Sequence, residues 1–549
     1  RSRYELQNMR CNMKLPLAAA LLILFPSFSN AQEKGVSVFK SFDYVKSDNP
    51  WLVSPNTASL YTLSVKNIST VNVGMTKSDG SYMDVHESGN AAEAGAYTES
   101  YVKVSDRMAF SGKLSYSYFT GSKMCGPVLM DPSYNFINFE ESTTDNPGRK
   151  SKEVFDLSGG INYRLGDMWS LGGKLSYNTA NYSKLKDPRF ASKWADFGAS
   201  LGIASKLSDK VTLGIDGEFR KTVESVDADI FGEAAKTYYY IVDYGAYFGK
   251  RSMLDNSNGY LATEGSERRE SRPMVNQFYG GSLQADFTFS GSTRFFNEIS
   301  FLHRSGFFGR KSSGSIRYCD ASGNIISYKG VLSMKKNETA HYITLDGTYS
   351  SLGNEENNYK INSVPGSNLE VVYLGSQTAL DKTQINADLS YKGYAGLSGM
   401  LPDWEYGAEL GMNYTSLTSE SYPDYRKQDI TELDFNMYAV KNCKKGYNVF
   451  STGLYAGAHY GTGTKNEDGK KVSATGTAYS GTVYLDRNYE YRTSPAGFVK
   501  VSFKYSRIIR HGLTLFAEIS DSYTSMFKDP EFLSGRYRNV LNVTVGIDF

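Results

Sequence analysis

The sequence lacks the features of several large protein classes. Beyond residue 31 no run of about 18 consecutive apolar residues occurs, which excludes helical membrane spans. Four Cys and 14 Pro in 549 residues are too few for a disulfide scaffold or a Pro-rich chain. Basic and acidic residues nearly balance, 60 against 58, so the chain has no basic footprint for nucleic-acid binding.

Signals for catalysis are also scarce. The five His residues form neither an H-E-x-x-H motif nor a close His/Cys cluster, which leaves a metal site without support. No Gly-Lys pair has the glycine spacing of a phosphate-binding loop. We therefore predict no catalytic residues, no metal and no cofactor, and we do not expect an enzyme.

Tyrosine is what the chain has in excess. It holds 42 Tyr and 30 Phe but only 4 Trp, and aromatic residues make up 14% of the sequence. A tyrosine side chain has an apolar ring and a hydroxyl group that prefers water. It therefore suits surfaces where lipid and water meet.

The first 31 residues are typical of a secretory signal peptide and the residues upstream of it. Arg10 and Lys14 precede the apolar run 15–25, and the small residues Ser29 and Ala31 mark a cleavage site. Removing residues 1–31 takes away four basic residues and one acidic residue, so the formal net charge changes from +2 to −1. The remaining Cys125, Cys319 and Cys443 form either one disulfide and a free thiol or three free thiols.

From about residue 67 onward, apolar and polar residues alternate over long stretches. Period two places successive side chains on opposite faces of a β-strand. One such strand has Phe155, Leu157, Ile161 and Leu165 on one face and Asp156, Asn162 and Arg164 on the other. The chain ends in the same way, with Val543, Val545, Ile547 and Phe549 alternating with polar residues.

Strand and loop lengths separate a membrane barrel from a soluble sandwich. The alternating stretches run for about 10–14 residues, against about 5–6 in globular sheets. Tight turns near residues 105–106, 166–167, 208–209 and 510–512 alternate with long polar segments at 120–151, 224–272 and 461–494. Short turns at one end and long loops at the other are typical of outer-membrane barrels. We predict an all-β fold: a single transmembrane antiparallel β-barrel with short periplasmic turns and long extracellular loops.

The pattern predicts about 16 strands within residues 68–549, with a range of 14 to 18 because bacterial barrels prefer even numbers. The stretch 311–381 is ambiguous: His341–Leu345 and Leu369–Tyr373 indicate either two further strands or a hairpin above the membrane. Residues 32–67 precede the barrel as a short segment that is either periplasmic or inserted into the lumen. Expected strand starts lie near residues 68, 94, 107, 152, 168, 195, 210, 274, 293, 382, 404, 428, 447, 495, 511 and 537.

Three short features carry a resemblance to known families. The long Tyr-rich strands and the terminal Phe549, which the resemblance assigns to barrel assembly, look like outer-membrane barrels of the Bacteroides type. Lys186–Phe190 resembles a D-P-R feature of uncharacterised members of such families. Trp51 and Pro55–Leu60, which differ from N-P-A-G-L at Thr57 and Ser59, are distantly similar to the stretch that opens the long-chain fatty-acid transporter (FadL-type) superfamily. This implies an N-terminal hatch with Trp51, Pro55, Asn56 and Leu60 as its candidate residues.

Charged residues on the polar strand faces are the best evidence for function. Facing lipid, Lys or Arg would cost about 2–4 kcal/mol each, so these side chains must point into the lumen. They indicate either a polar conduit or a set of ion pairs that fills a closed barrel. The lumen-facing candidates are Lys113, Asp156, Arg164, Lys174, Asp216, Glu218, Arg220, Glu298, Glu409, Lys500, Lys504 and Glu518.

The sequence leads to two main functional hypotheses. The first is a channel or transporter for small polar or amphipathic solutes across the outer membrane of a Gram-negative bacterium. The second is a non-conducting accessory barrel that binds a partner transporter, a surface lipoprotein or a secretion component. In both cases we expect contacts with outer-membrane lipid, lipopolysaccharide and the barrel-assembly machinery, and none with nucleic acid.

Overall fold

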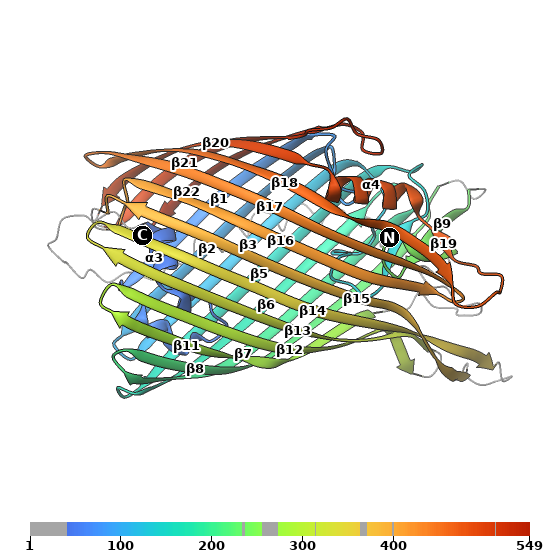
Figure 1. Ribbon diagram of the computed structural model, residues 1–549, viewed down its shortest axis with the longest axis horizontal. Helices are drawn as coiled ribbons and strands as arrows, with labels where there is room; N and C mark the ends of the chain where they lie inside the picture. The colour runs from blue at the N-terminus through green and yellow to red at the C-terminus, as the bar shows by residue number, and fades with distance from the viewer. Residues whose placement is uncertain are drawn as a thin grey trace, which may run out of the picture. The chain divides into compact units, whose positions relative to one another are not determined.

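The computed structural model describes residues 41–232, 236–254, 273–312, 315–362, 370–397, 400–510 and 512–549, all within one compact unit, Phe39–Phe549. The predicted signal peptide lies outside the described residues. Eighteen strands form one antiparallel sheet, which closes on itself because the first strand pairs with the last (Figure 1). The prediction of a single all-β antiparallel barrel is therefore confirmed.

The barrel strands follow one another around the ring in chain order, which is an up-and-down arrangement. They are β1 (Asn67–Gly80), β2 (Asn90–Ser105), β3 (Met108–Met124), β5 (Gly148–Leu165), β6 (Trp169–Lys184), β7 (Arg189–Ser208), β8 (Val211–Asp229), β11 (Pro273–Ser290), β12 (Thr293–Ser312), β13 (Ser315–Lys336), β14 (Thr339–Asn362), β15 (Glu370–Ala395), β16 (Trp404–Ser421), β17 (Asp424–Lys445), β18 (Asn448–Lys470), β20 (Ala496–Arg510), β21 (Leu513–Met526) and β22 (Tyr537–Asp548).

The expected count of 16 strands is too low, because β13 and β14 both lie in the ambiguous stretch. His341 and Leu345 belong to β14, whereas Val371 and Tyr373 begin β15 and do not form a strand of their own. In β13 the sequence Gly323–Asn324–Ile325–Ile326 breaks the apolar–polar alternation, which removed the signal on which the prediction depended.

The connections divide the barrel into two ends, here called the turn end and the loop end. At the turn end, β2 and β3, β5 and β6, and β7 and β8 are joined by connections of a few residues, and Phe549 lies there too. At the loop end, residues 125–147, 230–272 and 471–495 connect β3 to β5, β8 to β11 and β18 to β20. Residues 255–272 lie outside the described part of the chain.

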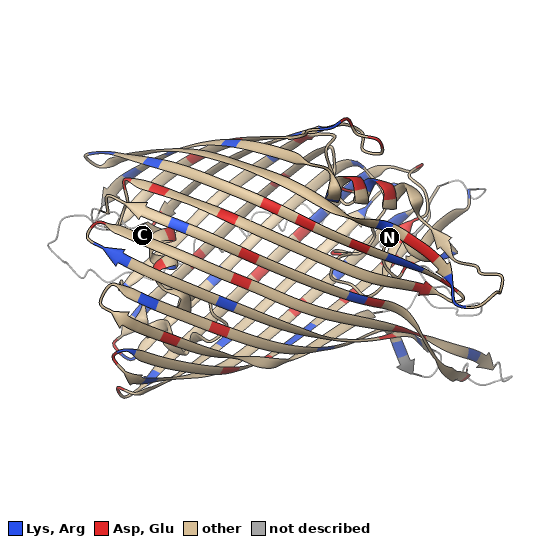
Figure 2. Ribbon diagram, viewed as in Figure 1, with Lys and Arg blue, Asp and Glu red and all other residues tan. Residues whose placement is uncertain are grey.

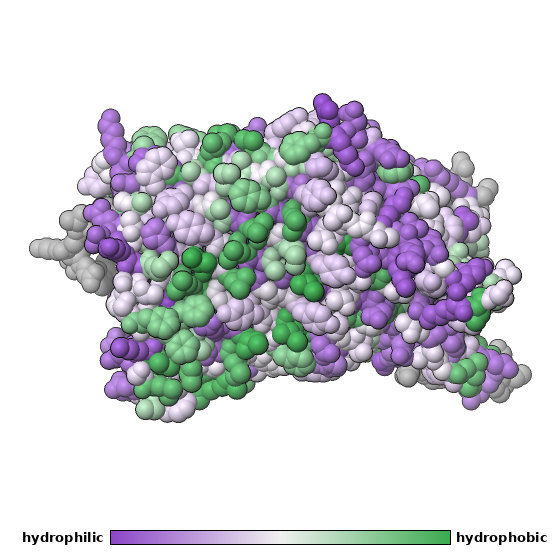
Figure 3. Space-filling model, in the orientation of Figure 1, coloured by the Kyte–Doolittle hydropathy of each residue, from purple (hydrophilic) through white to green (hydrophobic). Residues whose placement is uncertain are grey.

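The two faces of the barrel wall differ in chemistry. Large apolar side chains are exposed on the outside, with Leu157 at 52%, Leu201 at 76% and Val545 at 53% exposure. Figure 3 shows such side chains gathered over the strands on the side of the turn end, whereas hydrophilic residues dominate toward the loop end. The strands therefore extend beyond the apolar part of the wall at the loop end.

Short elements outside the barrel wall lie at both ends. The N-terminal segment, residues 41–66, holds the helix α3 (Phe42–Asp48) and the 3-10 helices η1 (Pro50–Leu52) and η2 (Thr57–Thr62). Toward the loop end lie the helix α4 (Thr482–Thr493) and a second sheet in the order β19 (Tyr479–Ser480), β10 (Phe248–Leu254), β9 (Tyr238–Asp243) and β4 (Asn138–Glu141) (Figure 1). Among the described residues, no helix has both the length and the apolar character needed to cross a membrane.

Candidate functional site

All twelve predicted lumen-facing residues lie on the strand face that points into the barrel. On β5, for example, Leu157 and Ile161 are exposed outside, while Asn162 on the alternate face is fully buried against the N-terminal segment. The same parity places all twelve predicted residues inside, and Figure 2 shows acidic and basic residues recurring along the barrel strands. Whether these residues select a solute remains a prediction.

Two of the predicted residues with an ion pair, Lys113 and Arg220, pair across neighbouring strands, whereas Arg164 pairs with Asp167 in the turn that follows β5. Lys113 on β3 pairs with Asp156 on β5 at 2.7 Å, and Arg220 on β8 pairs with Asp196 on β7 at 2.7 Å. In these two pairs the partner of each charged residue lies on an adjacent strand. The reason is geometric: a side chain two positions along a strand is farther away than its cross-strand neighbours.

Some predicted interior residues make no ion pair with any described residue. Lys174, Glu218, Glu409, Lys500, Lys504 and Glu518 are in this group. Two of them lie over aromatic rings: Lys500 is 4.9 Å from the Tyr455 ring centre, and Lys504 is 4.2 Å from that of Phe516. These interior residues are therefore not held in close ion pairs by the described part of the wall.

Three side-chain caps shape the N-terminal segment. The Ser41 hydroxyl accepts from the backbone N–H of Tyr44 at the start of α3. The Asn49 carboxamide oxygen accepts from the N–H of Trp51, and that of Asn56 accepts from the N–H of Ala58. Such caps satisfy backbone donors that would otherwise be unpaired at a helix start. The segment is therefore held in a compact form by its own sequence.

Two of the hatch candidates, Trp51 and Asn56, dock deep in the barrel. Trp51 is 1% exposed, donates its indole N–H to Asp286 at 2.8 Å and meets Phe296 edge to face at 5.1 Å. The Asn56 amide donates to Gln284 Oε1 at 2.8 Å. A buried indole usually has such a partner, because an unpaired N–H costs free energy.

The other hatch candidates contact the wall nearby. Pro55 offers its carbonyl oxygen to Ser200 on β7 at 3.0 Å. Leu60, 2% exposed, packs in an apolar cluster with Val45, Tyr101 and Ala109. All four candidates therefore lie in the contact between the N-terminal segment and the barrel wall; their action as a hatch stays a proposal.

Glycines on the inner wall make room for this contact. A Cβ atom at Gly172 on β6 would overlap the backbone nitrogen of Ala58, and one at Gly202 on β7 would overlap the Asn56 carboxamide. A glycine inside a strand often marks a close approach of another backbone. The sequence analysis did not identify these two glycines as part of the contact. Their occurrence on the inner face of consecutive strands was the signal that could have indicated it.

Helix α3 connects opposite sides of the ring. Lys46 pairs with Glu99 on β2 at 2.9 Å, while Asp48 accepts from the Tyr342 hydroxyl on β14 at 2.9 Å. In the closed order of eighteen strands, β2 and β14 stand on opposite sides. The N-terminal segment therefore crosses the barrel interior at the turn end.

The connection 125–147 crosses the interior toward the loop end. Arg304 on β12 donates to the Tyr134 carbonyl at 2.9 Å, Asn354 on β14 to that of Phe136 at 3.0 Å, and Lys382 on β15 to that of Ser133 at 2.8 Å. Because this connection starts at β3, it reaches the far side of the ring. With β9, β10, β19 and α4 it makes up what we call the loop-end cover.

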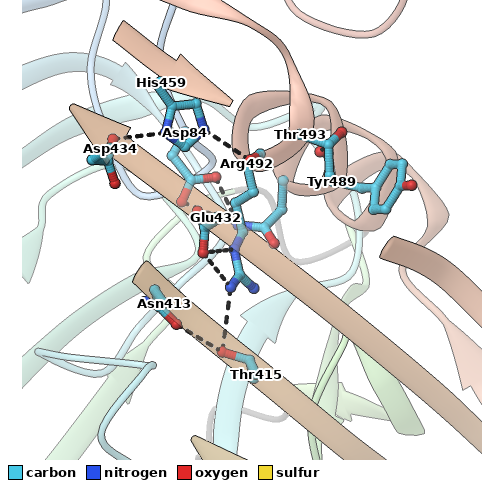
Figure 4. A network of polar contacts seen from close by, with 10 residues as sticks. Asp84, Asn413, Thr415, Glu432, Asp434, His459, Tyr489, Arg492 and Thr493 are labelled. Carbon is cyan, nitrogen blue, oxygen red and sulfur yellow. Dashed lines mark hydrogen bonds and ion pairs between the residues drawn. The ribbon is translucent and has the colours of Figure 1, made fainter. Parts of the chain in front are cut away.

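Helix α4 is fixed to the inner wall by its last residues (Figure 4). Arg492 donates to Glu432 on β17 at 2.6 and 3.0 Å. His459 on β18 bridges the Arg492 carbonyl at 2.8 Å and Asp434 at 2.9 Å. These contacts draw α4 toward the barrel interior.

The D-P-R feature anchors another long connection. Asp187 accepts from the Arg189 guanidinium at 2.9 Å and from the backbone N–H groups of Phe231 and Gly232. The Arg189 guanidinium lies 4.7 Å from the Phe231 ring centre. This feature therefore joins the start of the connection 230–272 to the tip of β6 and β7.

The loop-end cover contains a carboxyl group without a hydrogen bond. Glu140 on β4 is 0% exposed, and neither oxygen has a hydrogen-bond partner among the described residues. Burial raises the pKa of Glu140 well above its usual range, and the nearby Asp243 adds to the rise, with Lys150 opposing it. The neutral acid is therefore the stable form in the folded cover.

Because of this carboxyl group, we expect the stability of the loop-end cover to depend on pH. The group ionises near pH 4.5 in the unfolded cover but not in the folded one, so above that pH the cover should lose about 1.4 kcal/mol per pH unit, up to the folded-state pKa. Glu140→Gln should remove this slope, so β4 and β9 exchange amide hydrogens more slowly than wild type at pH 8 and equally at pH 5. Identical pH profiles in both proteins would contradict the assignment.

The three remaining cysteines are all free thiols: Cys125, Cys319 and Cys443. Among the described residues, no group of three His, Cys, Asp or Glu side chains is arranged to hold a metal ion. The terminal Phe549 exchanges two backbone hydrogen bonds with Ser69 on β1, at 2.7 and 2.9 Å. Its role in barrel assembly remains a prediction.

A family model described as a family of unknown function (DUF6850) matches residues 58–549. The chain belongs to this family. A search of curated proteins found no relative of this DUF6850 chain.

Solved structures similar to the DUF6850 chain are large barrels at very low identity. The ferric preacinetobactin receptor from Acinetobacter baumannii is 7% identical, with a TM-score of 0.40 over 88% of this chain and 80% of that one. The outer membrane transporter YddB from Escherichia coli is 7% identical, with a TM-score of 0.37 over 87% of this chain and 81% of that one. A mutant of the TodX monoaromatic hydrocarbon channel is 12% identical, with a TM-score of 0.30 over 91% of this chain and 94% of that one. The resemblance to Bacteroides-type barrels and to the long-chain fatty-acid transporter superfamily stays a prediction.

Proposed function

We propose that this chain is an outer-membrane β-barrel transporter for small polar or amphipathic solutes, and that the N-terminal segment closes its turn end. The observation that carries the proposal is the contrast between an exposed apolar outer face and a charged inner face on the same strands. Lipid accommodates the first face and water the second. A barrel whose interior was simply a packed core would be lined by apolar residues, not by charged ones.

The mode of docking supports a removable closure. Besides the apolar contacts of Trp51 and Leu60, the N-terminal segment contacts the wall through side-chain hydrogen bonds and ion pairs, such as Lys46 with Glu99 and Ser54 with Glu298 at 2.5 Å. Such polar contacts can exchange for water when the segment moves away. The segment is continuous with β1, so it stays tethered at the turn end.

Planar-bilayer recordings of the purified protein without residues 1–31 test the proposal. We expect rare, brief openings from wild type and stable open steps from a variant with weakened docking, as described in the Discussion. A membrane that stays silent with both proteins, while both are folded, would refute transport.

The accessory barrel is the second candidate, and the loop-end cover favours it. The cover shares an apolar core with the inner barrel wall, in which Phe136, Phe139, Tyr240 and Val242 of the cover are about 1% exposed. Such an ordered surface suits the binding of a surface lipoprotein or a partner transporter. Silent bilayers together with stable co-purification of another outer-membrane protein would support this candidate.

Paired cysteine substitutions test the assignment of the two faces. In a Cys443→Ser background, a lipid-phase thiol probe should label Leu157→Cys and Phe219→Cys. Their sequence neighbours Asp156→Cys and Arg220→Cys face the interior and should resist the probe. Equal labelling within either pair would mean that the barrel does not sit in the membrane as proposed.

A further inference from the structure

A cavity of about 360 Å³ lies inside the barrel beneath the loop-end cover. Its wall comes from β22, β1, β2, β3, β5 and β6, and its roof from the connections 81–89 and 125–147. This volume is within the range of small-molecule sites in proteins, about 300–1,000 Å³.

Five side chains that line the cavity form one continuous row across five neighbouring strands. Each is the register partner of the next: Thr76 on β1, Glu93 on β2, Phe119 on β3, Lys152 on β5 and Tyr182 on β6. Register partners in antiparallel strands point to the same face. The row therefore presents an acid, an aromatic ring and a base side by side toward one space.

The two charges of this row are free to meet a ligand. Within the described residues, neither Glu93 nor Lys152 makes an ion pair or a side-chain hydrogen bond, and the Lys152 ammonium lies 6.0 Å from the Phe119 ring centre. Their strands are separated by β3, so their Cα atoms stand about 10 Å apart. The other acid–base pair at the cavity, Glu87 with Arg538, is already closed at 2.6 Å.

Part of the cavity lining beside the row is apolar, whereas His86, Glu87 and Ser88 line it from the connection 81–89. Met124, Leu129 and Met130 contribute to the apolar part from the end of β3 and the connection that follows. Phe119 extends this apolar surface down between the two charges. The cavity thus combines a negative group, a positive group and an apolar surface in fixed order.

We propose that this cavity binds a small zwitterion with an apolar body, an amino acid or a dipeptide. The ligand ammonium faces Glu93, its carboxylate faces Lys152, and its apolar side chain lies against Phe119 and the apolar part of the lining. This inference rests on the proposed function, since it names the class of solute that the barrel would take.

Three probes that share one ring test the charge requirement by titration calorimetry on the folded protein in detergent. L-Phenylalanine carries both charges, 3-phenylpropanoate lacks the ammonium, and 2-phenylethylamine lacks the carboxylate. We expect phenylalanine to bind at least about tenfold more tightly than either analogue, because hydrogen bonds to charged groups are among the strongest polar contacts. Equal affinity for all three probes would overturn the proposal.

Two variants assign the charges to residues. Lys152→Met should weaken the binding of phenylalanine and 3-phenylpropanoate at least about tenfold but leave that of 2-phenylethylamine unchanged. Glu93→Gln should weaken the binding of phenylalanine and 2-phenylethylamine and leave that of 3-phenylpropanoate unchanged. The matched controls are Glu153→Gln, next to Lys152 but facing outward on β5, and Lys193→Met, outward on β7. Both should bind all three probes as wild type does. If Lys152→Met and Glu93→Gln also bind like wild type, the site is wrong.

Binding and conductance separate this inference from the proposed function. A barrel that conducts but does not bind phenylalanine overturns the zwitterion site and leaves transport standing. A barrel that binds phenylalanine with the expected variant pattern but never conducts supports the site and refutes transport.

Discussion

Replacing Gly172 with leucine is expected to drive the N-terminal segment out of the barrel interior. Even a Cβ atom at this position would overlap the Ala58 backbone nitrogen, and the backbone of a closed barrel wall has little freedom to retreat. Overpacking of this kind costs about 1–3 kcal/mol or more. Leaving relieves this overlap, and the polar contacts of the segment, such as Lys46 with Glu99, then exchange for water.

Two measurements should report the release. The peptide bond after Lys46, half-buried in the docked segment, should become readily cleaved by trypsin in the variant. Single-channel recordings should change from brief openings to stable open steps with several times the mean current. The control is Gly159→Leu on β5, an outward position where a Cβ atom meets nothing within 4 Å. If Gly159→Leu opens the barrel equally, the effect does not come from the docked segment.

Replacing Lys184 with methionine is expected to loosen the loop-end cover. The Lys184 side chain is 0% exposed and lies 2.6 Å from Glu141, which is 4% exposed. Removing one partner of such a pair leaves a buried charge without compensation and typically destabilises a protein by about 3–5 kcal/mol. Here that loss should fall on β4 and its connections, because Glu141 belongs to β4.

Hydrogen exchange separates this local effect from general unfolding. Amides of β4 and β9 should exchange about a hundredfold or more faster in Lys184→Met, corresponding to about 3 kcal/mol, whereas the barrel strands should keep wild-type rates. Lys193→Met provides the control, because Lys193 and Asp227 are 66% and 56% exposed and 3.7 Å apart. Such surface pairs contribute about 0–1 kcal/mol. Similar exchange in both variants would refute a supporting role for Lys184.

The sequence allowed the barrel to be predicted because alternation is a local property. Each residue on β5, β8 or β22 needs only its immediate neighbours to indicate which face it occupies. β13 was missed for the same reason, since Ile325 and Ile326 are adjacent and face opposite sides. The alternation indicates which residues face the interior. It does not indicate which of those residues contact one another.

Contacts across the barrel could not be predicted from local patterns. Lys46 meets Glu99, and Trp51 meets Asp286 more than two hundred residues away, only because the ring brings their strands to one space. The zwitterion cavity depends in the same way on register, which sets Glu93, Phe119 and Lys152 in a row. A shift of one residue in any of these strands would turn its side chain to the outside of the barrel.

The pairing of β1 with β22 has a consequence for the order of assembly. The wall cannot be sealed until the last residues of the chain have been added, because β22 is one side of the seam. The N-terminal segment directly precedes β1 and spans from β2 to β14. Its contacts therefore join two strands that stand on opposite sides of the ring. A docked segment that joins these two strands favours a ring of this circumference.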